Sequence, residues 1–283
     1  MPIDFQPPAE HSADPEAAPA RKGEKVMGFL EHLEELRWTL VKCAITITVL
    51  ATLSGVFMPQ VRGFLEWPWA RALAAFPDLR IELRTDSPME VYGVMVQVCL
   101  VPALVASIPF VLFFLAQFVG PALSAKEMRV LRPAVGLGVV LFLGGAAFSY
   151  LLLVPKSIVV SIATTQWMGY AMLWTVGSYY SMLTWLVLGM GAIFEFPLVL
   201  LALSYLGIVE VETFRRSRRL VIVICLIVAA FITPTQDPVT LFLVAAPMWA
   251  LFEISLVVAA IIERRKAKAE KAEDYDWRQT YGG

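Results

Sequence analysis

Long apolar runs separated by short polar segments set the pattern of hydrophobic and polar positions along this chain. Five runs are long enough to cross a hydrocarbon core of about 30 Å as helices, since a span takes roughly 20 residues. They lie at 38–58, 91–118, 133–154, 179–206 and 239–262. A sixth run, at 220–232, would give only about 20 Å of helix. It is either a buried hairpin partner or a span in locally thinned membrane, and we count it as a short fifth span. The pattern predicts an all-α integral membrane protein with six transmembrane helices.

Prolines inside two of these runs predict bent helices. Pro102 and Pro109 lie within 91–118, and Pro197 lies within 179–206. Each proline removes a backbone N–H donor and so interrupts the hydrogen bonds of its helix. We therefore expect a bundle of bent helices with a concave face.

A different pattern precedes the first run. Residues 26–37 place apolar side chains at helical spacing, with glutamates on the opposite face. This pattern is typical of an amphipathic helix that lies on the membrane surface. Its acidic face is unusual, because the cytoplasmic leaflet is itself negative and attracts basic segments. The carboxylates therefore suggest a cationic partner.

Composition and charge agree with a membrane protein and give its orientation. Hydrophobic residues make up 58% of the chain and charged residues only 17%, which is too apolar for a soluble domain. The segments on one side of the predicted spans hold 18 Lys and Arg residues, and those on the other side hold 5. Since cytoplasmic loops are enriched in Lys and Arg, both termini are predicted to be cytoplasmic. The net charge of −1 gives no argument for binding nucleic acid.

The chain divides into three parts. Residues 1–24 are rich in Pro, Ala and charge, and we expect a disordered leader. Residues 25–264 form the predicted membrane domain, and 265–283 form a charged cytoplasmic tail.

The residue types do not favour an enzyme. His11 and His32 are the only histidines, and both precede the first predicted span. The sequence contains no glycine-rich phosphate loop and no Cys/His cluster with metal-ligand spacing. We therefore predict no catalytic residues, no cofactor and no metal site.

Two glutamates lie inside apolar runs. Inserting an ionisable group at such a position costs on the order of 3 kcal/mol, so intramembrane carboxylates are often functional. Glu195 is either a functional group or a neutral carboxyl that only holds helices together. The same alternatives stand for Glu253, whose charge could also be met by Arg264 and Arg265 reaching towards it.

The polar segment 119–132 contains a third candidate. Ser124 and Glu127 have the spacing of a capping box, which would give Glu127 a structural role at the start of a helix. Glu127 also lies among Lys126, Arg129 and Arg132, and it could simply be paired with one of them. The residues alone leave a structural and a functional role open.

Several motifs together resemble the TatC family, the six-span subunit of the twin-arginine protein translocase. The matching segments are FLEHLEELR at 29–37, FVGPAL at 118–123, KE at 126–127, FEFP at 194–197, TP and DP at 233–234 and 237–238, and LFE at 251–253. They occur in the family's order and at fitting positions relative to the predicted spans.

The resemblance implies a function and its partners. A protein of this family would recognise signal peptides that carry two adjacent arginines, at the cytoplasmic face of a bacterial inner membrane. It would act as an oligomer together with single-span partners of the TatA and TatB kind. The assembly would export folded proteins by using the proton-motive force.

The resemblance also assigns site residues. Glu35 and Glu127 match the positions linked to the arginine pair, which suits the bidentate pairing of guanidinium with carboxylate. Phe118 matches the aromatic residue beside that site, and Arg37 and Lys126 flank the two glutamates in sequence.

Four further residues are carried over from the family. Glu195 matches the intramembrane glutamate that meets a partner's helix, and Glu253 is assigned to the same role. Pro68 matches the proline of the first outside loop. The loop 233–238 is one residue longer than the family's short form, and we place the outside aspartate at Asp237.

Two other classes of protein remain as alternatives. A secondary transporter for a small solute would use Glu195 and Glu253 to carry protons or cations near the middle of the membrane. A scaffold would assemble other membrane proteins without handling cargo. A transporter gains nothing obvious from the acidic surface helix at 26–37, and a scaffold need not bury Glu195.

Overall fold

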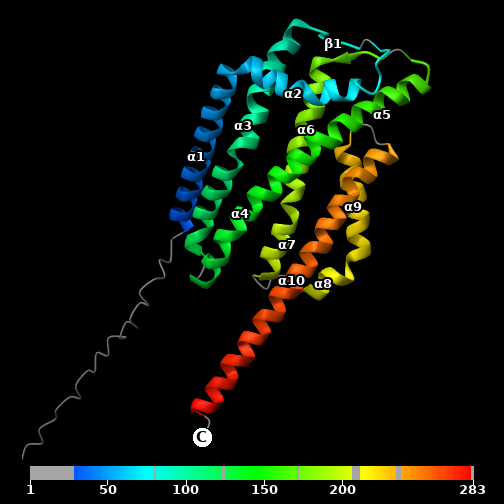
Figure 1. Cartoon of the computed structure of the whole chain (residues 1–283). Helices are drawn as coiled ribbons and strands as arrows, with labels where there is room; N and C mark the ends of the chain where they lie inside the picture. Colours follow the sequence, from blue (N-terminus) through cyan, green and yellow to red (C-terminus); the bar gives the residue numbers. More distant parts are fainter. Residues whose placement is uncertain are drawn as a thin grey trace, which may run out of the picture.

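The structure is a computed structural model. It describes residues 29–79, 81–122, 125–170, 172–205, 211–233 and 237–281. Within these ranges, side chains are described from 31 to 263, except at 122–127 and 205–211. Helices form almost all of the described chain (Figure 1). In order, the elements are α1 (Phe29–Val56), α2 (Met58–Leu73), β1 (Leu83–Arg84), α3 (Pro88–Val119), η1 (Gly120–Ala122), α4 (Ala125–Phe148), η2 (Ser149–Leu153), α5 (Val154–Trp167), β2 (Trp174–Thr175), α6 (Val176–Phe194), α7 (Phe196–Tyr205), α8 (Val211–Arg216), α9 (Arg218–Ile232) and α10 (Pro238–Tyr281).

Five helical segments of the described chain are long and apolar enough to cross a membrane. They are Glu31–Val56, Pro88–Val119, Met128–Trp167, Val176–Ser204 and Pro238–Glu263. Each contains or largely overlaps one of the five long predicted spans. α9 has 15 residues and corresponds to the predicted short fifth span. The chain is therefore an all-α integral membrane protein, and the count of six spans stays a prediction.

α1 differs from the prediction of a separate surface helix. It runs without a break from Phe29 to Val56, so the described part of 26–37 forms the first turns of the same helix as the first span. The reason is that no Gly or Pro lies between residues 29 and 54 to interrupt the helix.

The surface of α1 is largely exposed. Its contacts are almost all with α3, and Trp38, Leu40 and Val49 are each more than half exposed. Three threonine hydroxyls of α1 are satisfied within the helix: Thr48 Oγ1 donates a hydrogen bond to the carbonyl of Ala44 at 2.8 Å, and two other threonines bond in the same way. An exposed helix of this composition is suited to lipid contact.

The third span extends further than predicted. α4, η2 and α5 follow one another without a gap, so the helix continues to Trp167 and not to residue 154. η2 is a single π-helical turn in which Ser149 and Leu153 are buried. A π-turn of this kind is a local wide turn within an otherwise α-helical segment.

α2, α5 and the two short strands cover the end of the bundle opposite to the C-terminus (Figure 1). β1 and β2 pair in parallel, with Leu83 opposite Trp174 and Arg84 opposite Thr175. Trp69 of α2 is only 7% exposed, and its ring packs edge-on against Trp174 and Tyr179. These segments therefore form a packed cap rather than free loops.

The main core surrounds α6. Its fully buried side chains pack against α2, α3, α4 and α5; they include Tyr179, Tyr180, Leu183, Leu186 and Met190. α4 and α6 are in close contact at Gly145, where an added Cβ would lie 2.6 Å from the carbonyl oxygen of Met190. Small residues commonly permit such close helix contacts in membranes.

A second, smaller core lies among α7, α8, α9 and α10. It consists of Leu200, Phe252 and Leu256, with Phe214 and Val221 packed against them. α10 is therefore joined to the rest of the molecule mainly through α7 and α9.

The predicted terminal parts are only partly described. The leader at 1–24 lies outside the described residues. The predicted tail continues α10 as a helix to Tyr281, and its side chains lie outside those described. The division into leader, membrane domain and tail stays a prediction.

Candidate functional site

One candidate site lies at the end of the bundle where α10 ends. The start of α1, the junction of α3 with α4 and the junction of α7 with α8 all lie at this end (Figure 1). The rings of His32 and Phe118 stack with their centroids 4.4 Å apart and their planes 16° apart. This contact holds the second turn of α1 against the last turn of α3.

Glu35 lies one helical turn after His32, on the same side of α1. The side chain is half-buried. Its Oε2 atom is buried and has no hydrogen-bond partner among the residues that the structure describes. An unsatisfied buried acceptor costs about 1–3 kcal/mol, and more when it is charged. Among the described residues, Glu35 therefore keeps one acceptor atom unused.

The remaining residues predicted at this end are described in part. Arg37 is exposed. α4 begins at Ala125; Ser124 lies outside the described residues, so the capping box stays a prediction. An added Cβ at Gly120 would lie 2.7 Å from Met128 Cε, so the beginning of α4 packs back against η1. The side chains of Lys126 and Glu127 lie outside those described.

Glu195 marks a break between two helices. α6 ends at Phe194 and α7 begins at Phe196. The break falls directly before Pro197, whose missing N–H interrupts the helix as predicted. The carboxylate is half-buried, and its Oε1 atom is buried without a hydrogen-bond partner within the described part of the chain.

A glycine of α4 makes room for the Glu195 side chain. A Cβ added at Gly138 would lie 3.1 Å from Glu195 Oε2, 3.1 Å from Leu112 Cδ1 and 3.2 Å from Leu198 Cδ2. The carboxylate is therefore directed against the backbone of α4 and is bordered by leucines from α3 and α7. These described neighbours are apolar.

Glu253 differs from Glu195 because it has a partner. Its Oε2 atom lies 3.0 Å from an Nη atom of Arg218. Arg218 is the first residue of α9, so the pair joins α9 to α10. The sequence suggested Arg264 and Arg265 as partners, and their side chains lie outside those described.

The two residues predicted in the outside loops, Pro68 and Asp237, lie within or directly before a helix. Pro68 is buried inside α2. Asp237 directly precedes α10, and its Oδ1 accepts a hydrogen bond from the N–H of Thr240 at 2.9 Å. Asp237 is therefore the N-cap residue of α10.

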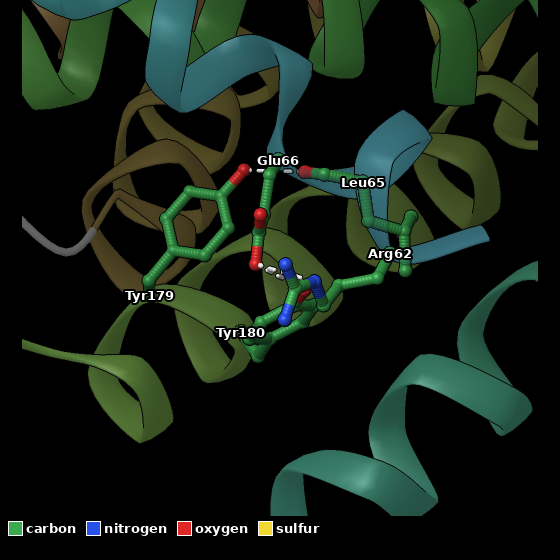
Figure 2. Close-up of polar contacts among 5 residues, drawn as sticks. All are labelled: Arg62, Leu65, Glu66, Tyr179 and Tyr180. Carbon is green, nitrogen blue, oxygen red and sulfur yellow. Dashed lines mark hydrogen bonds and ion pairs between the residues drawn. The ribbon is translucent and has the colours of Figure 1, made fainter. Parts of the chain in front are cut away.

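Figure 2 shows a polar cluster that the sequence reasoning missed. Tyr179 donates a hydrogen bond to the carbonyl of Leu65 at 2.5 Å. Glu66 Oε1 accepts a hydrogen bond from the hydroxyl of Tyr180 at 3.3 Å and lies 3.6 Å from Arg62 Nε. The four-residue spacing of Arg62 and Glu66 was a signal for their pairing. The tyrosines come from α6, and no local pattern predicts them.

A second missed residue, Glu90, joins α3 to α6. Its Oε1 accepts a hydrogen bond from the N–H of Gly177 at 2.8 Å, and its Oε2 accepts one from the N–H of Asp86 at 2.7 Å. Ser87 caps the same helix by accepting from the N–H of Glu90. The sequence Ser-x-x-Glu was the signal for this capping arrangement.

The part of the chain that the structure describes contains no group of three or more His, Cys, Asp and Glu residues suited to a metal ion. Among the candidate carboxylates, Glu35 and Glu195 have aromatic or apolar neighbours, whereas Glu253 is paired with Arg218. Such groups can bind cations and polar helices, which is the chemistry of recognition.

Comparison with known proteins identifies the family. The sequence model of the Sec-independent protein translocase protein (TatC) matches residues 31–247. The chain belongs to the TatC family. TatC proteins are components of a protein translocase, so this chain is a transport protein and not an enzyme.

Individual TatC proteins match over most of their length. The TatC protein of Koribacter versatilis is 30% identical over 254 residues, which cover 88% of this chain and 93% of that protein. The TatC protein of Aquifex aeolicus is also 30% identical, over 87% of this chain and all of that protein. The TatCd protein of Bacillus subtilis is 30% identical over 86% of this chain and 96% of that protein.

Solved structures agree with the sequence relatives. A crystal structure of the twin-arginine translocase receptor TatC has a TM-score of 0.67 and 30% identity, and the match covers 82% of this chain and 99% of the solved one. A crystal structure of the same receptor in DDM has a TM-score of 0.68. The predicted family is confirmed, and with it a multi-pass membrane protein of a bacterial translocase.

Proposed function

We propose that this chain recognises twin-arginine signal peptides at the cytoplasmic face of a bacterial inner membrane. In this proposal both termini are cytoplasmic, as the distribution of Lys and Arg predicts. The chain acts as an oligomer with TatA-type and TatB-type single-span subunits, and the assembly exports folded proteins by using the proton-motive force. The partners and the energy source follow from the family resemblance.

The observation that carries the proposal is the buried Oε2 atom of Glu35, which has no hydrogen-bond partner within the described part of the chain. It lies one turn from the stacked rings of His32 and Phe118. A guanidinium can pair with the carboxylate and stack on an aromatic face, which an ammonium does less well. Glu127, in the first turn of α4, supplies the second carboxylate in this proposal, with Arg37 and Lys126 beside the two acids.

The intramembrane carboxylates have separate roles in the proposal. Glu195 accepts a polar group from a partner's transmembrane helix, since its Oε1 atom has no partner among the described residues. Glu253 is less suited to this role because Arg218 already pairs with it. Pro68 and Asp237 hold the opposite end of the bundle through packing within α2 and capping of α10.

Site-specific photocrosslinking in native membranes tests the receptor role. Photoreactive residues at positions 34 and 128, which leave Glu35 and Glu127 in place, should crosslink to a twin-arginine signal peptide and not to its twin-lysine variant. A photoreactive residue at position 71, in α2 at the opposite end, serves as the control and should crosslink to neither. Equal crosslinking of the two peptides would contradict the proposal and would favour a solute transporter.

A pair of neighbouring variants tests the role of Glu35. Glu35→Gln should weaken binding of the twin-arginine peptide roughly tenfold or more, because a charge-assisted pair contributes about 1.5–3 kcal/mol. Glu34→Gln removes the same charge from an exposed neighbour and should leave binding nearly unchanged. If both variants bind equally well, Glu35 does not contact the peptide.

A further inference from the structure

A cavity of about 570 Å³ lies beside the cluster in Figure 2, between α2, the β1 segment and the first turns of α3 and α6. This volume is in the range of pockets that hold small molecules. The cavity belongs to the end of the bundle that carries α2 and α5, away from the stacked rings of His32 and Phe118. It is therefore separate from the peptide site proposed above.

One wall of the cavity is apolar and follows a membrane-spanning helix. Val91, Val94, Met95 and Val98 line it, and they extend over about 10 Å of α3. Val91 and Met95 are 45% and 43% exposed. The neighbouring residues Tyr92 and Val96 are more than 60% exposed on the same helix. Because this wall continues the lipid-facing surface of α3, the occupant it suits is a lipid chain.

The other wall carries both signs of charge. Arg62, Glu66 and Glu82 line the cavity. The Arg62 side chain is 65% exposed and that of Glu66 is 32% exposed. The contacts that Tyr180 and Arg62 make with Glu66 both go to Oε1, so the second carboxylate oxygen is available to a donor. A guanidinium beside two carboxylates matches a headgroup that contains a phosphate and an ammonium.

The donor set distinguishes between zwitterionic headgroups. A primary ammonium has three N–H donors for Glu66 and Glu82, whereas a quaternary ammonium has none. Quaternary ammonium groups are instead bound by open aromatic faces. Trp69, the indole that lines the cavity, is 7% exposed and packed against Trp174 and Tyr179. The site therefore favours the primary ammonium.

We propose that this cavity is a binding site for a phospholipid of the ethanolamine type. The phosphate pairs with Arg62, the ammonium donates to Glu66 and Glu82, and an acyl chain lies along Val91, Val94 and Met95. Lipids with an anionic headgroup and no ammonium fit less well, because two carboxylates would face them. The proposal does not depend on the receptor function.

Photoreactive lipids in nanodiscs test the proposal. The purified full chain is reconstituted with a phosphatidylethanolamine or a phosphatidylcholine that carries the same photoreactive acyl chain, and labelled peptides are mapped by mass spectrometry. The ethanolamine lipid should label residues 91–98 at least about three times more than the choline lipid, because only its ammonium can donate a charge-assisted hydrogen bond. Equal labelling by the two lipids would overturn the proposal.

Variants locate the site and separate it from bulk lipid. Arg62→Gln and Glu66→Gln should each lower ethanolamine-lipid labelling of 91–98 about three- to tenfold, and the glutamine at 66 still accepts the hydrogen bond of Tyr180. Arg71→Gln is the matched control, because Arg71 lies on the same helix over the ring of Trp67 and does not line the cavity. An equal decrease in Arg71→Gln would contradict the proposal.

A cavity-filling variant keeps the test valid if the charge variants do not fold. Met95→Trp fills the cavity from its exposed side and leaves Arg62 and Glu66 in place. Labelling of α3 by the ethanolamine lipid should fall at least threefold, because an excluded lipid can no longer make its charge-assisted hydrogen bonds to the cavity wall. Unchanged labelling, or crosslinking of the site to a polypeptide in native membranes in place of lipid, would overturn the proposal.

Discussion

Glu195 and Glu253 are both glutamates in apolar segments, but their contacts with the rest of the chain differ. Glu253 Oε2 lies 3.0 Å from Arg218 in a pair that joins α9 to α10. Glu195 lies at the break between α6 and α7, bordered by Gly138 and two leucines, with its Oε1 atom buried and unpartnered within the described residues. One carboxylate is paired within the chain, and the other keeps an acceptor atom without a partner among the described residues.

The difference teaches how to separate structural from functional charges in a membrane protein. A paired carboxylate contributes to the fold that contains both partners, so its removal affects stability first. An unpaired buried carboxylate costs stability in the isolated chain. Its presence is explained when a partner supplies the missing hydrogen bond.

The largest expected effect is on partner association. Glu195→Ala should reduce copurification of a TatB-type or TatA-type subunit at least about tenfold, because a hydrogen bond to a charged group is lost in an apolar environment. Glu253→Ala should reduce it less than twofold. Comparable losses in the two variants would remove the distinction between the two residues.

Crowding the Glu195 side chain should have the next largest effect. Gly138→Leu places atoms where Glu195 Oε2 lies, since even a Cβ would be 3.1 Å away. We expect a loss of partner association of about three- to tenfold from displacing this hydrogen-bonding group. Gly136→Leu is the control on the same helix, because a Cβ there meets nothing within 4 Å. Equal effects would mean that helix α4 as a whole is disturbed.

Thermal unfolding of the isolated chain should change in opposite directions. Glu195→Leu removes an unsatisfied group and should raise the free energy of unfolding by about 1 kcal/mol. Glu253→Leu leaves Arg218 without its partner and should lower it by a similar amount, about 1 kcal/mol. Melting in detergent, followed by circular dichroism, measures both. A decrease in each case would show that Glu195 is held by the fold.

The smallest expected effect is the coupling between Arg218 and Glu253. Their side chains are 50% and 26% exposed, so a double-mutant cycle should give about 0.5 kcal/mol. The coupling should decrease in high salt because exposed pairs are screened. A coupling above about 2 kcal/mol would indicate that the pair is effectively buried.

The spans could be predicted from the sequence because hydrophobic length is a local property. The five long apolar runs all correspond to helices, and the short run at 220–232 corresponds to α9. The ends of the helices were less predictable. α1 begins before its apolar run, and α5 continues beyond residue 154, because amphipathic residues extend a helix without extending the apolar signal.

The candidate site was predictable only in part. Glu35 and Phe118 followed from the family motifs, but their link through the ring of His32 joins residues of two different helices. Likewise Tyr179 bonds to Leu65 across 114 positions, and Arg218 meets Glu253 across two helices. Contacts between distant segments depend on how the helices pack, and no spacing rule within a single sequence specifies them.

The exposed surface of α1 has a consequence for how the protein is made. α1 bonds its own threonine hydroxyls and touches almost nothing except α3. The ribosome completes α1 before it makes α3, so the newborn helix enters the bilayer with no docking surface yet available. Because three of its threonine hydroxyls are already hydrogen-bonded within the helix, its apolar part is stable there before α3 is made. Insertion of the first helix and assembly of the bundle are therefore separate events in biogenesis.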